Sequence, residues 1–366
     1  MSQGPDVDCS VLVPVLNEER HVAASVAAMQ EQRFPGRIEF LLVDGGSTDR
    51  TRELLRGMAA QDDRIRLLEN PRGATPSALN MALAHARGHW VARMDAHSSY
   101  PEDYLARGVA RLKRGGTQWV SGPQVAVGRD PVSRAVALAL GTPIGRGGSK
   151  KWGAQRTANC GEYELDSGVF DGVWDRRTLL DYRGWDERWL RNQDSEMAGR
   201  FLANGERLIC LKPMAASYTP RSSLESLWCQ YLQYGEYREK TAVRHPHTMR
   251  RSHLLAPGLV LTAAVAVGAP RPIRTGARAG VAVYALTLMG AASRVALDGA
   301  PPRDAALMPV VLAIMHVGHG LGMLRGAIRN GPPLAAIASV FGWEWLAMRV
   351  APAHEDVYAP SLEFGD

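Results

Sequence analysis

The first 130 residues alternate short apolar runs with amphipathic stretches, and this alternation is the feature that most restricts how the chain can fold. The apolar runs of strand length are residues 9–14, 38–43, 65–69 and 89–94. The amphipathic stretches of helix length are residues 18–32, 49–60, 75–86 and 101–114. Strands that alternate with helices in this way predict an α/β fold with a mostly parallel sheet and flanking helices.

Charge is distributed unevenly along the chain. The 366 residues include 43 basic and 37 acidic side chains, but residues 254–366 hold only eight arginines and seven acids. Three uncharged runs lie in that tail, at residues 254–270, 279–293 and 305–324. A membrane-spanning helix needs about 20 apolar residues, so the third run is long enough, and the second becomes so if Arg294 snorkels. The sequence therefore predicts C-terminal α-helical membrane segments.

These two features predict three regions. Residues 1–250 form a cytosolic domain, residues 251–350 a membrane-associated helical region, and residues 351–366 a C-terminal tail. The first ten residues do not join a basic segment to an apolar one, so we expect no secretory signal. The predicted location is the cytoplasmic (inner) membrane, with the N-terminal domain facing the cytosol.

The arginines of the tail bear on its topology. The positive-inside tendency favours two crossings, at about residues 279–297 and 305–324, over three. Residues 254–270 are then expected to lie in the membrane plane or to re-enter, and residues 334–350 to form an interfacial helix. Three crossings remain the alternative.

Composition excludes several classes of protein. The four cysteines stand far apart without a Cys-x-x-Cys pair, which argues against a zinc ribbon or a disulfide framework. The net charge of +6 is spread thinly over the chain. Nucleic acid is therefore not an expected partner.

Ligands of parallel α/β sheets bind at the carboxyl ends of the strands, so the polar residues just after each strand are the candidates for a ligand site. The segment 44–49 reads Asp-Gly-Gly-Ser-Thr-Asp and lies between a buried strand and a helix. Its glycines allow close approach of the backbone, and Asp44 is able to accept hydrogen bonds from a ligand. Capping of the following helix by Ser47 or Asp49 is an equally good interpretation of this segment alone.

A second segment, Asp95-Ala96-His97, directly follows the strand 89–94. A carboxylate and an imidazole at this spacing are able to share one divalent cation, either Mn²⁺ or Mg²⁺, with phosphate oxygens and water. Taken alone, the pair is more often a turn cap and a surface histidine.

A third segment, Asn192-Gln193-Asp194-Ser195-Glu196, opens an amphipathic helix. Carboxylates in a first helical turn commonly serve the helix dipole. The functional alternative makes Asp194 a general base. Further upstream, residues 167–170 are expected to form a strand between Asp166 and Asp171.

Taken together, in this order and spacing, the segments 13–19, 44–49, 94–97 and 193–196 resemble the inverting family-two glycosyltransferases of the GT-A fold. Within that family, the chain resembles the membrane glucosyltransferases of succinoglycan-type exopolysaccharide assembly. That group likewise has Asp-Ala-His where most relatives have Asp-x-Asp. The group also has a Gln-rich segment, here residues 230–235, before hydrophobic helices.

The resemblance implies roles for individual residues. Residues expected to bind the nucleotide-sugar are Pro14, Asn17, Glu18, Asp44, Gly46, Ser47, Arg72, Asp95 and Ala96. Asp44 would contact the uracil base. Asp95 and His97 would hold the metal on the diphosphate, and Asp194 would take the proton of the acceptor hydroxyl.

The acceptor and leaving-group side is expected to include Asp166, Glu196, Gln230 and Gln233. Processive relatives carry Gln-x-x-Arg-Trp, and here Gln233 stands in place of the arginine, which favours addition of a single sugar. The expected enzyme moves a hexose from a UDP-sugar to a membrane or lipid-linked glycan acceptor, with membrane lipids as further partners. A catalytically silent, nucleotide-sugar-binding scaffold subunit and a nucleotidyl or phosphosugar transferase are the alternatives.

Overall fold

The structure is a computed structural model and describes residues 7–152 and 161–350. By its internal contacts the chain divides into two compact units. Unit 1 comprises the described residues 7–125 and 161–218, and unit 2 comprises residues 126–152 and 219–350. The boundary at residue 250 concerns membrane association and remains a prediction, and the tail 351–366 lies outside the described residues.

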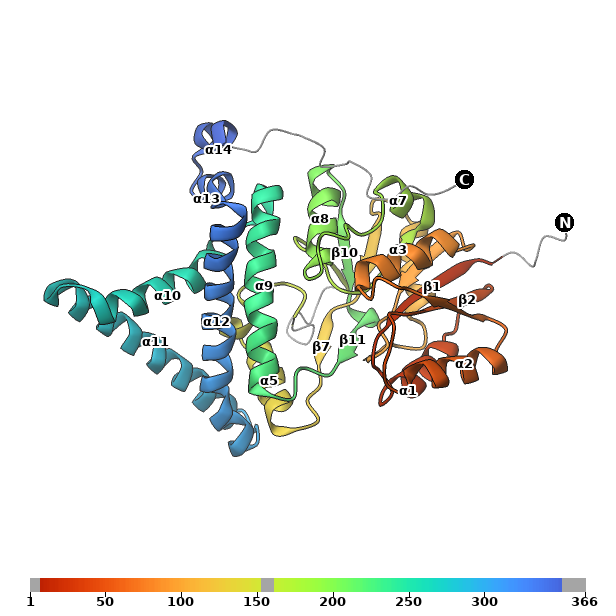
Figure 1. Ribbon diagram of the computed structural model, residues 1–366, viewed down its shortest axis with the longest axis horizontal. Coiled ribbons are helices and arrows are strands. Elements are labelled where there is room, and N and C mark those ends of the chain that lie inside the picture. The colour runs from red at the N-terminus through yellow and green to blue at the C-terminus, as the bar shows by residue number, and fades with distance from the viewer. Residues whose placement is uncertain (1–6, 153–160, 351–366) are drawn as a thin grey trace. The chain divides into compact units, whose positions relative to one another are not determined.

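Unit 1 contains the sheets (Figure 1). Its strands are β1 (Cys9–Val15), β2 (Ile38–Asp44), β3 (Ile65–Glu69), β4 (Trp90–Arg93), β5 (Ser98–Ser99), β6 (Trp119–Ser121), β7 (Gln124–Ala126, at the unit boundary), β8 (Glu162–Leu165), β9 (Gly172–Asp175), β10 (Leu208–Leu211) and β11 (Ala216–Tyr218). Its α-helices are α1 (Val22–Gln30), α2 (Thr51–Gln61), α3 (Thr75–His85), α4 (Tyr104–Lys113), α7 (Arg176–Asp181) and α8 (Gln193–Ala203).

The larger sheet has eight strands in the order β3-β2-β1-β4-β9-β6-β10-β8. The pairs β3–β2, β2–β1, β1–β4 and β6–β10 are parallel, whereas β9 runs antiparallel to both β4 and β6, and β8 runs antiparallel to β10. The smaller sheet has the order β5-β11-β7. The predicted mostly parallel α/β fold is confirmed.

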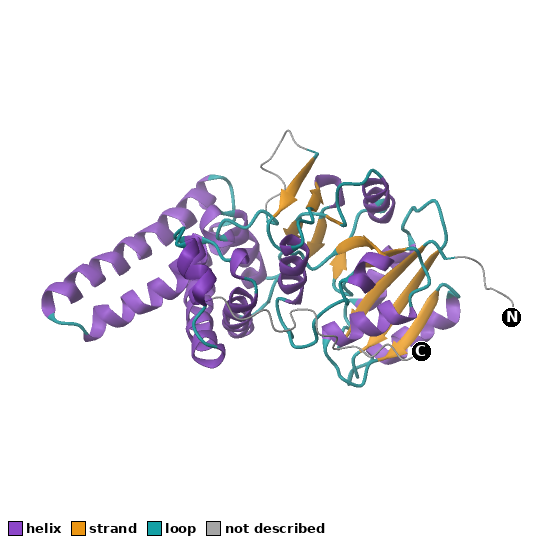
Figure 2. Cartoon of the chain, turned by 90° about the horizontal axis from the view of Figure 1, so that it is seen from above, coloured by secondary structure: helices purple, strands orange, loops and turns teal. Residues whose placement is uncertain are grey.

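Each face of the larger sheet is covered by helices, as Figure 2 shows. Along β1 and β2 successive side chains point to opposite faces, as the strand period of two requires. Val11 and Phe40 pack in one hydrophobic cluster with residues of α1, α2 and α4. Leu12 and Leu41 pack in the other, with residues of α3 and α8. The near-continuous apolar runs of the sequence arise because both faces are buried.

The strand predicted at residues 167–170 is wrong, because the chain bends there between β8 and β9. Gly168 explains the bend, since a Cβ atom at this position would lie 2.0 Å from the carbonyl oxygen of Asp194. The backbone of this loop is therefore packed directly against the start of α8. This close packing of the loop backbone against the start of α8 takes the place of the strand hydrogen bonding that the sequence predicted.

Unit 2 is helical. Its α-helices are α5 (Pro131–Gly141), α6 (Pro143–Arg146), α9 (Leu224–Arg244), α10 (Arg251–Gly268), α11 (Arg271–Leu297), α12 (Pro302–Asn330), α13 (Leu334–Val340) and α14 (Glu344–Val350). The three helices α10, α11 and α12 are each long and apolar enough to cross a membrane. The single interfacial helix predicted at residues 334–350 is in fact two short helices, because Gly342 adopts a left-handed φ of 75° between them.

Candidate active site

The carboxyl ends of β1, β2 and β4 lie at one edge of the larger sheet. Val15 of β1 pairs with Asp44 of β2, and Leu12 of β1 pairs with Arg93 of β4. The polar segments that follow these strands therefore meet, although up to 80 residues separate them in the chain. The residues expected to bind the nucleotide and the metal therefore lie at the same edge of the sheet, as the parallel topology requires.

The loops after β1 and β2 are tied to each other. Asn17, which has a φ of 54°, accepts a hydrogen bond at Oδ1 from the Thr48 backbone N–H at 2.8 Å. In return, the Asn17 N–H donates to Oγ of Ser47 at 2.9 Å. Ser47 does not cap α2, since that helix starts at Thr51 and Ser47 bonds across to the other loop. Asn17 and Ser47 thus set the shape of the loops.

Asp44 is fully buried at the end of β2. Its Oδ1 accepts from the Ser47 N–H at 3.1 Å, and its Oδ2 accepts from Nε of Arg52 at 3.0 Å. Although burial opposes ionisation, these hydrogen bonds and the Arg52 charge hold the pKa of Asp44 below its usual value. Asp44 is therefore an ionised acceptor.

Arg93, the last residue of β4, links two carboxylates. Its Nε and Nη2 donate to the two oxygens of Asp95, at 2.8 and 3.1 Å, and its Nη1 donates to Oδ1 of Asp194 at 2.6 Å. Only 3% of the Arg93 side chain is exposed. Burial disfavours the charge, but the neighbouring Asp194 and Asp95 raise the pKa of Arg93 above its usual value. The buried Arg93 guanidinium therefore holds both Asp95, the candidate metal ligand, and Asp194, the candidate base.

Two further polar groups surround this ion-pair cluster. The Asp95 backbone N–H donates to the hydroxyl of Tyr100 at 2.8 Å, and that ring is buried. Asp171 precedes β9, whose first residue pairs with Arg93. Burial, with a contribution from the Asp95 charge, raises the pKa of Asp171 to about 8, against the effects of Tyr104 and Arg93. Asp171 is therefore mostly protonated at neutral pH.

Asp194 lies in the first turn of α8, after Asn192 with a φ of 55°. The close approach of Gly168 to the Asp194 carbonyl and the bond from Arg93 hold both the backbone and the carboxylate. Its side chain is 16% exposed. A carboxylate that is held in place and still reaches solvent has the properties required of a general base.

His97 lies beyond Asp95, with Nδ1 at 3.0 Å from Oε1 of Glu18. Within the described residues, no three His, Cys, Asp or Glu side chains converge in a way that would hold a metal. The donors nevertheless suit Mn²⁺ or Mg²⁺, because such ions commonly take one or two protein ligands and complete their shell with water and substrate phosphates. Asp95 retains lone pairs beyond the two that Arg93 uses.

Comparisons with known proteins identify the family of this chain. Residues 10–163 match the model of the family described as "Glycosyl transferase family 2". The chain is 30% identical to the Succinoglycan biosynthesis protein ExoA of Rhizobium meliloti (strain 1021) over 333 residues, which cover 90% of each protein. The chain belongs to glycosyl transferase family 2.

Two other similarities are informative. The chain is 27% identical over 238 residues to the Beta-monoglucosyldiacylglycerol synthase of Nostoc sp. (strain PCC 7120), covering 62% of this chain and 48% of that one. Among solved structures, it is similar to mannosyltransferase PcManGT from Pyrobaculum calidifontis in complex with GDP-Man and Mn²⁺. That likeness has a TM-score of 0.54 and 21% identity, and covers 86% of this chain and 87% of the other.

The fold of this family-two member is GT-A, and the chain is a nucleotide-sugar-dependent glycosyltransferase. Membership sets aside both the silent scaffold subunit and the nucleotidyltransferase as its function. The resemblance to exopolysaccharide glycosyltransferases is confirmed by the relative that covers nearly the whole chain.

The remaining residues predicted to bind the nucleotide-sugar all lie in unit 1. Pro14 is the penultimate residue of β1, Gly46 has a φ of 87°, and Ala96 is buried between Asp95 and His97. Arg72 pairs with Glu187, which also accepts from Asn80 at 3.2 Å. This ion pair links the loop after β3 to the segment before α8. Both segments belong to unit 1.

The four acceptor-side candidates are divided between the two units. Asp166 directly follows β8. Glu196 is fully buried and bonded to Arg200, with N–O distances of 2.9 to 3.1 Å. Its buried ion pair supports a role in holding α8 and not in contacting an acceptor. Gln230 and Gln233 lie on α9 of unit 2, where Gln230 donates to the Tyr234 hydroxyl at 3.1 Å.

Sequence reasoning missed Arg93, Asp171 and Tyr100. The available signal for Arg93 was a charged residue inside an otherwise apolar strand, since a buried cation must be paired. Its partner Asp194 is 101 positions away, so the pattern of the sequence does not identify it. Asp171 and Tyr100 carry no comparable local signal.

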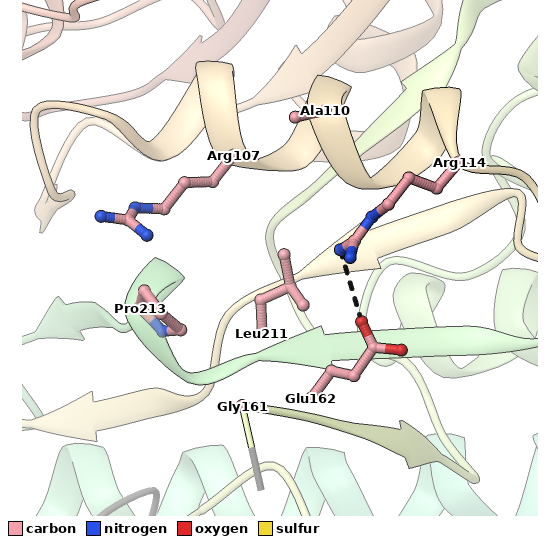
Figure 3. A pocket seen from close by; sticks show the side chains of 7 residues that line it. All are labelled: Arg107, Ala110, Arg114, Gly161, Glu162, Leu211 and Pro213. Carbon is pink, nitrogen blue, oxygen red and sulfur yellow. Dashed lines mark ion pairs between the residues drawn. The ribbon is translucent and has the colours of Figure 1, made fainter.

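A cavity of about 480 Å³ lies beside α4 in the same unit (Figure 3). It is lined by Arg107, Ala110, Arg114, Gly161, Glu162, Leu211 and Pro213. Both arginines are paired, Arg107 with Asp103 and Arg114 with Glu162. The cavity holds none of the predicted site residues and is not the candidate active site.

Proposed function

We propose that this enzyme transfers a hexose, with inversion, from a UDP-sugar to a membrane or lipid-linked glycan acceptor at the cytosolic face of the cytoplasmic membrane. The observation that carries the proposal is the Arg93 bridge, because it holds Asp95 and Asp194 on one guanidinium group. Inverting transfer needs a leaving-group stabiliser and a base at one anomeric carbon. The bridge keeps the carboxylates for both roles close together.

The nucleotide is proposed to bind across the loops after β1 and β2. Asp44 is ionised, and its oxygens retain acceptor capacity for the uracil N–H. The Asn17 and Ser47 hydrogen bonds hold the two loops before the donor binds, which lowers the entropy lost on binding. Glu18 and Arg72 would complete this side.

Asp95 and His97 would hold a divalent cation, Mn²⁺ or Mg²⁺. When bound, such an ion neutralises the charge that develops on the departing diphosphate. The solved mannosyltransferase of similar fold contains Mn²⁺ together with its nucleotide-sugar. Arg93 positions the Asp95 carboxylate, and Tyr100 accepts from the Asp95 backbone, so the side chain is held before the ion arrives.

Asp194 is proposed to accept the proton of the attacking hydroxyl. As the acceptor oxygen bonds to the anomeric carbon, the bond from that carbon to the diphosphate oxygen breaks, and the proton passes to an Asp194 oxygen. The Arg93 charge stabilises the Asp194 carboxylate in the resting enzyme, and the first turn of α8 has the same effect through its dipole. General bases of this kind contribute roughly 100-fold to 10,000-fold.

The proposed acceptor is lipid-linked or membrane-bound. Three apolar helices associate the chain with a membrane, and the relatives include a succinoglycan biosynthesis protein and a diacylglycerol glycolipid synthase. Gln233 stands where processive relatives have arginine, which supports addition of one sugar per acceptor.

A donor screen tests the proposal. Membranes that contain the enzyme are incubated with UDP- and GDP-hexoses, with and without lipid extract, and release of nucleoside diphosphate is measured. Release that needs a UDP-hexose and increases with lipid extract is expected. Release only from a GDP-sugar, or only without lipid, would contradict the proposed donor or acceptor.

A further inference from the structure

Three segments of unit 2 that are far apart in the chain meet at the first turn of α10. They are residues 146–152, at and after the end of α6, residues 250–252, and residues 340–345, where α13 ends and α14 begins. Most of their large side chains are basic or aromatic. None of the three segments contains a residue of the candidate active site.

The first contact joins the loop after α6 to the start of α10. Nη1 of Arg250 donates to the Gly148 carbonyl oxygen at 3.4 Å. Gly147 and Gly148 both have a left-handed φ, of 57° and 79°, which favours glycine. Lys150 and Lys151 follow within three residues, so their backbone lies no more than about 11 Å from Gly148. The glycine turn therefore keeps both lysines near the first turn of α10.

The second contact joins the end of α13 to the start of α10. Nε of Arg251 donates to the Val340 carbonyl oxygen at 3.4 Å. Val340 and Leu254 of α10 also pack against one buried cluster, which includes residues of α9, α12 and α13. Trp343 is fixed close by, because its N–H donates to the Ala338 carbonyl oxygen at 2.9 Å. The junction of α13 and α14 is thus held beside the first turn of α10.

The three segments carry an excess of positive charge. Their basic side chains are those of Arg146, Lys150, Lys151, Arg250 and Arg251. Glu344 is the one acid in the three segments, and residues 131–152 and 240–297 contain no Asp or Glu. A basic cluster of this kind beside an apolar helix favours an anionic partner.

The aromatic side chains of the third segment are exposed. All nine tryptophans belong to the described residues, and only Trp343 and Trp345 are exposed, at 51% and 62%. The ring of Phe341 is also exposed and stacks on Trp343 with the ring centroids 5.3 Å apart. Exposed tryptophans beside Lys and Arg are typical of the headgroup level of a membrane, where these residue types concentrate.

The position of the cluster on α10 agrees with that level. The helix is apolar enough to enter a membrane and is uncharged from residue 254 onward, so its charged first turn marks the edge of the apolar part. A protein partner explains the combination less well, because charged residues are depleted from the cores of protein interfaces. A lipid surface accepts both the charges and the rings.

We propose that these three segments form a docking site for anionic phospholipid headgroups. The basic side chains bind lipid phosphate, and the tryptophan rings lie at the boundary between headgroups and acyl chains. The site lies at a membrane surface whatever the number of crossings. It depends on neither the donor nor the acceptor proposed above.

Tryptophan quenching by brominated lipids tests the site without any need for activity. The full-length enzyme in non-ionic detergent micelles receives increasing mole fractions of phosphatidylglycerol or phosphatidylcholine, each brominated close to the headgroup. Bromine quenches tryptophans that contact the lipid. We expect half-maximal quenching at a mole fraction at least about tenfold lower for phosphatidylglycerol, because each basic side chain near an anionic surface strengthens binding about fivefold. High salt should reduce this preference.

Two substituted proteins assign the signal to the site. Trp343→Phe combined with Trp345→Phe should remove most of the quenching. Lys150→Gln, Lys151→Gln and Arg251→Gln together should remove most of the preference for phosphatidylglycerol and leave the phosphatidylcholine curve unchanged. Equal quenching by the two lipids, a preference that survives loss of the three charges, or quenching that persists without the two tryptophans would each overturn the proposal.

The matched control removes three exposed arginines of unit 1, with Arg33→Gln, Arg56→Gln and Arg177→Gln in one protein. Both quenching curves should stay unchanged. The same loss of preference as in the triple variant of the site would show that net charge and not the site selects the lipid, and would contradict the proposal.

A lipid-linked acceptor is the rival ligand, because it also carries phosphate. Unlabelled phosphatidylglycerol and unlabelled polyprenyl diphosphate are therefore compared as competitors of the brominated phosphatidylglycerol. Competition by polyprenyl diphosphate at a mole fraction more than ten times lower would assign the site to the acceptor and overturn the proposal. Any weaker competition supports a site for phospholipid headgroups.

Discussion

Arg93 and Asp194 are 101 positions apart in the chain, yet Nη1 of one lies 2.6 Å from Oδ1 of the other. The same guanidinium binds both oxygens of Asp95 through its other two nitrogens, Nε and Nη2. Planar, multidentate pairing of this kind is a property of arginine that lysine does not share. The contact connects the end of a central strand to the start of a helix, and the following predictions concern it.

Asp194→Asn keeps the volume of the side chain but removes its basicity. Turnover should fall roughly 100-fold to 10,000-fold, because a neutral amide does not take the acceptor proton. Binding of the nucleoside diphosphate, measured by titration calorimetry, should persist. Turnover close to that of the unsubstituted enzyme would exclude Asp194 as the base.

Arg93→Lys keeps the charge but not the ability to hold both carboxylates. We expect kcat to fall more than the KM for the donor rises, since Asp194 loses its orientation. Arg93→Met should also lower the free energy of unfolding by about 3 kcal/mol, because Asp95 and Asp194 then lack a buried partner. Thermal unfolding in detergent measures this loss, and an unchanged kcat in Arg93→Lys would refute the positioning role.

Asp95→Ala and His97→Ala test the metal site. Each should abolish transfer that depends on Mn²⁺ or Mg²⁺, and chelator should do the same to the unsubstituted enzyme. Arg66→Ala serves as a control, because that residue pairs with Glu39 and not with the site residues. Full activity in chelator would exclude the proposed cofactor.

Gly168→Ala tests a residue that contacts no substrate in the proposed mechanism. The added Cβ would lie 2.0 Å from the Asp194 carbonyl oxygen, so the start of α8 must shift. Because small displacements of a catalytic group are costly, we expect kcat to fall at least about tenfold. Gly57→Ala, whose Cβ meets no atom within 4 Å, is the matched control and should leave kcat unchanged.

Asp171 predicts how stability varies with pH. Burial raises its pKa from 3.8 to about 8 in the folded state, so the unfolded chain releases this proton at a lower pH than the folded protein does. The group therefore lowers the free energy of unfolding progressively as pH rises from about 4 to 8. Relative to the unsubstituted protein, Asp171→Asn should become more stable across that window in thermal unfolding experiments. A constant difference between the two proteins would show that Asp171 does not titrate this way.

Much of unit 1 could be predicted from the sequence because its signals are local. Residues 38–43, for example, are apolar except for Glu39, which is typical of a strand buried on both faces. Polar residues that follow parallel strands must meet at one edge of the sheet, so the positions of Asp44 and Asp95 followed from topology. The strand expected at residues 167–170 failed because a packing contact with α8 took precedence over the local pattern.

The sequence by itself determined the alternation that gives the α/β sheet, the family, and the apolar character of three helices. Only the tertiary structure decided which charges pair, and it assigned Arg93 to Asp95 and Asp194, and Glu196 to Arg200. It also distinguished α12, of whose most apolar window 44% is buried, from α10 and α11, of which 6% and 11% are buried. The physical reason is the same in each case. Hydropathy and charge are properties of one residue, whereas burial and ion pairing depend on neighbours that are distant in the chain.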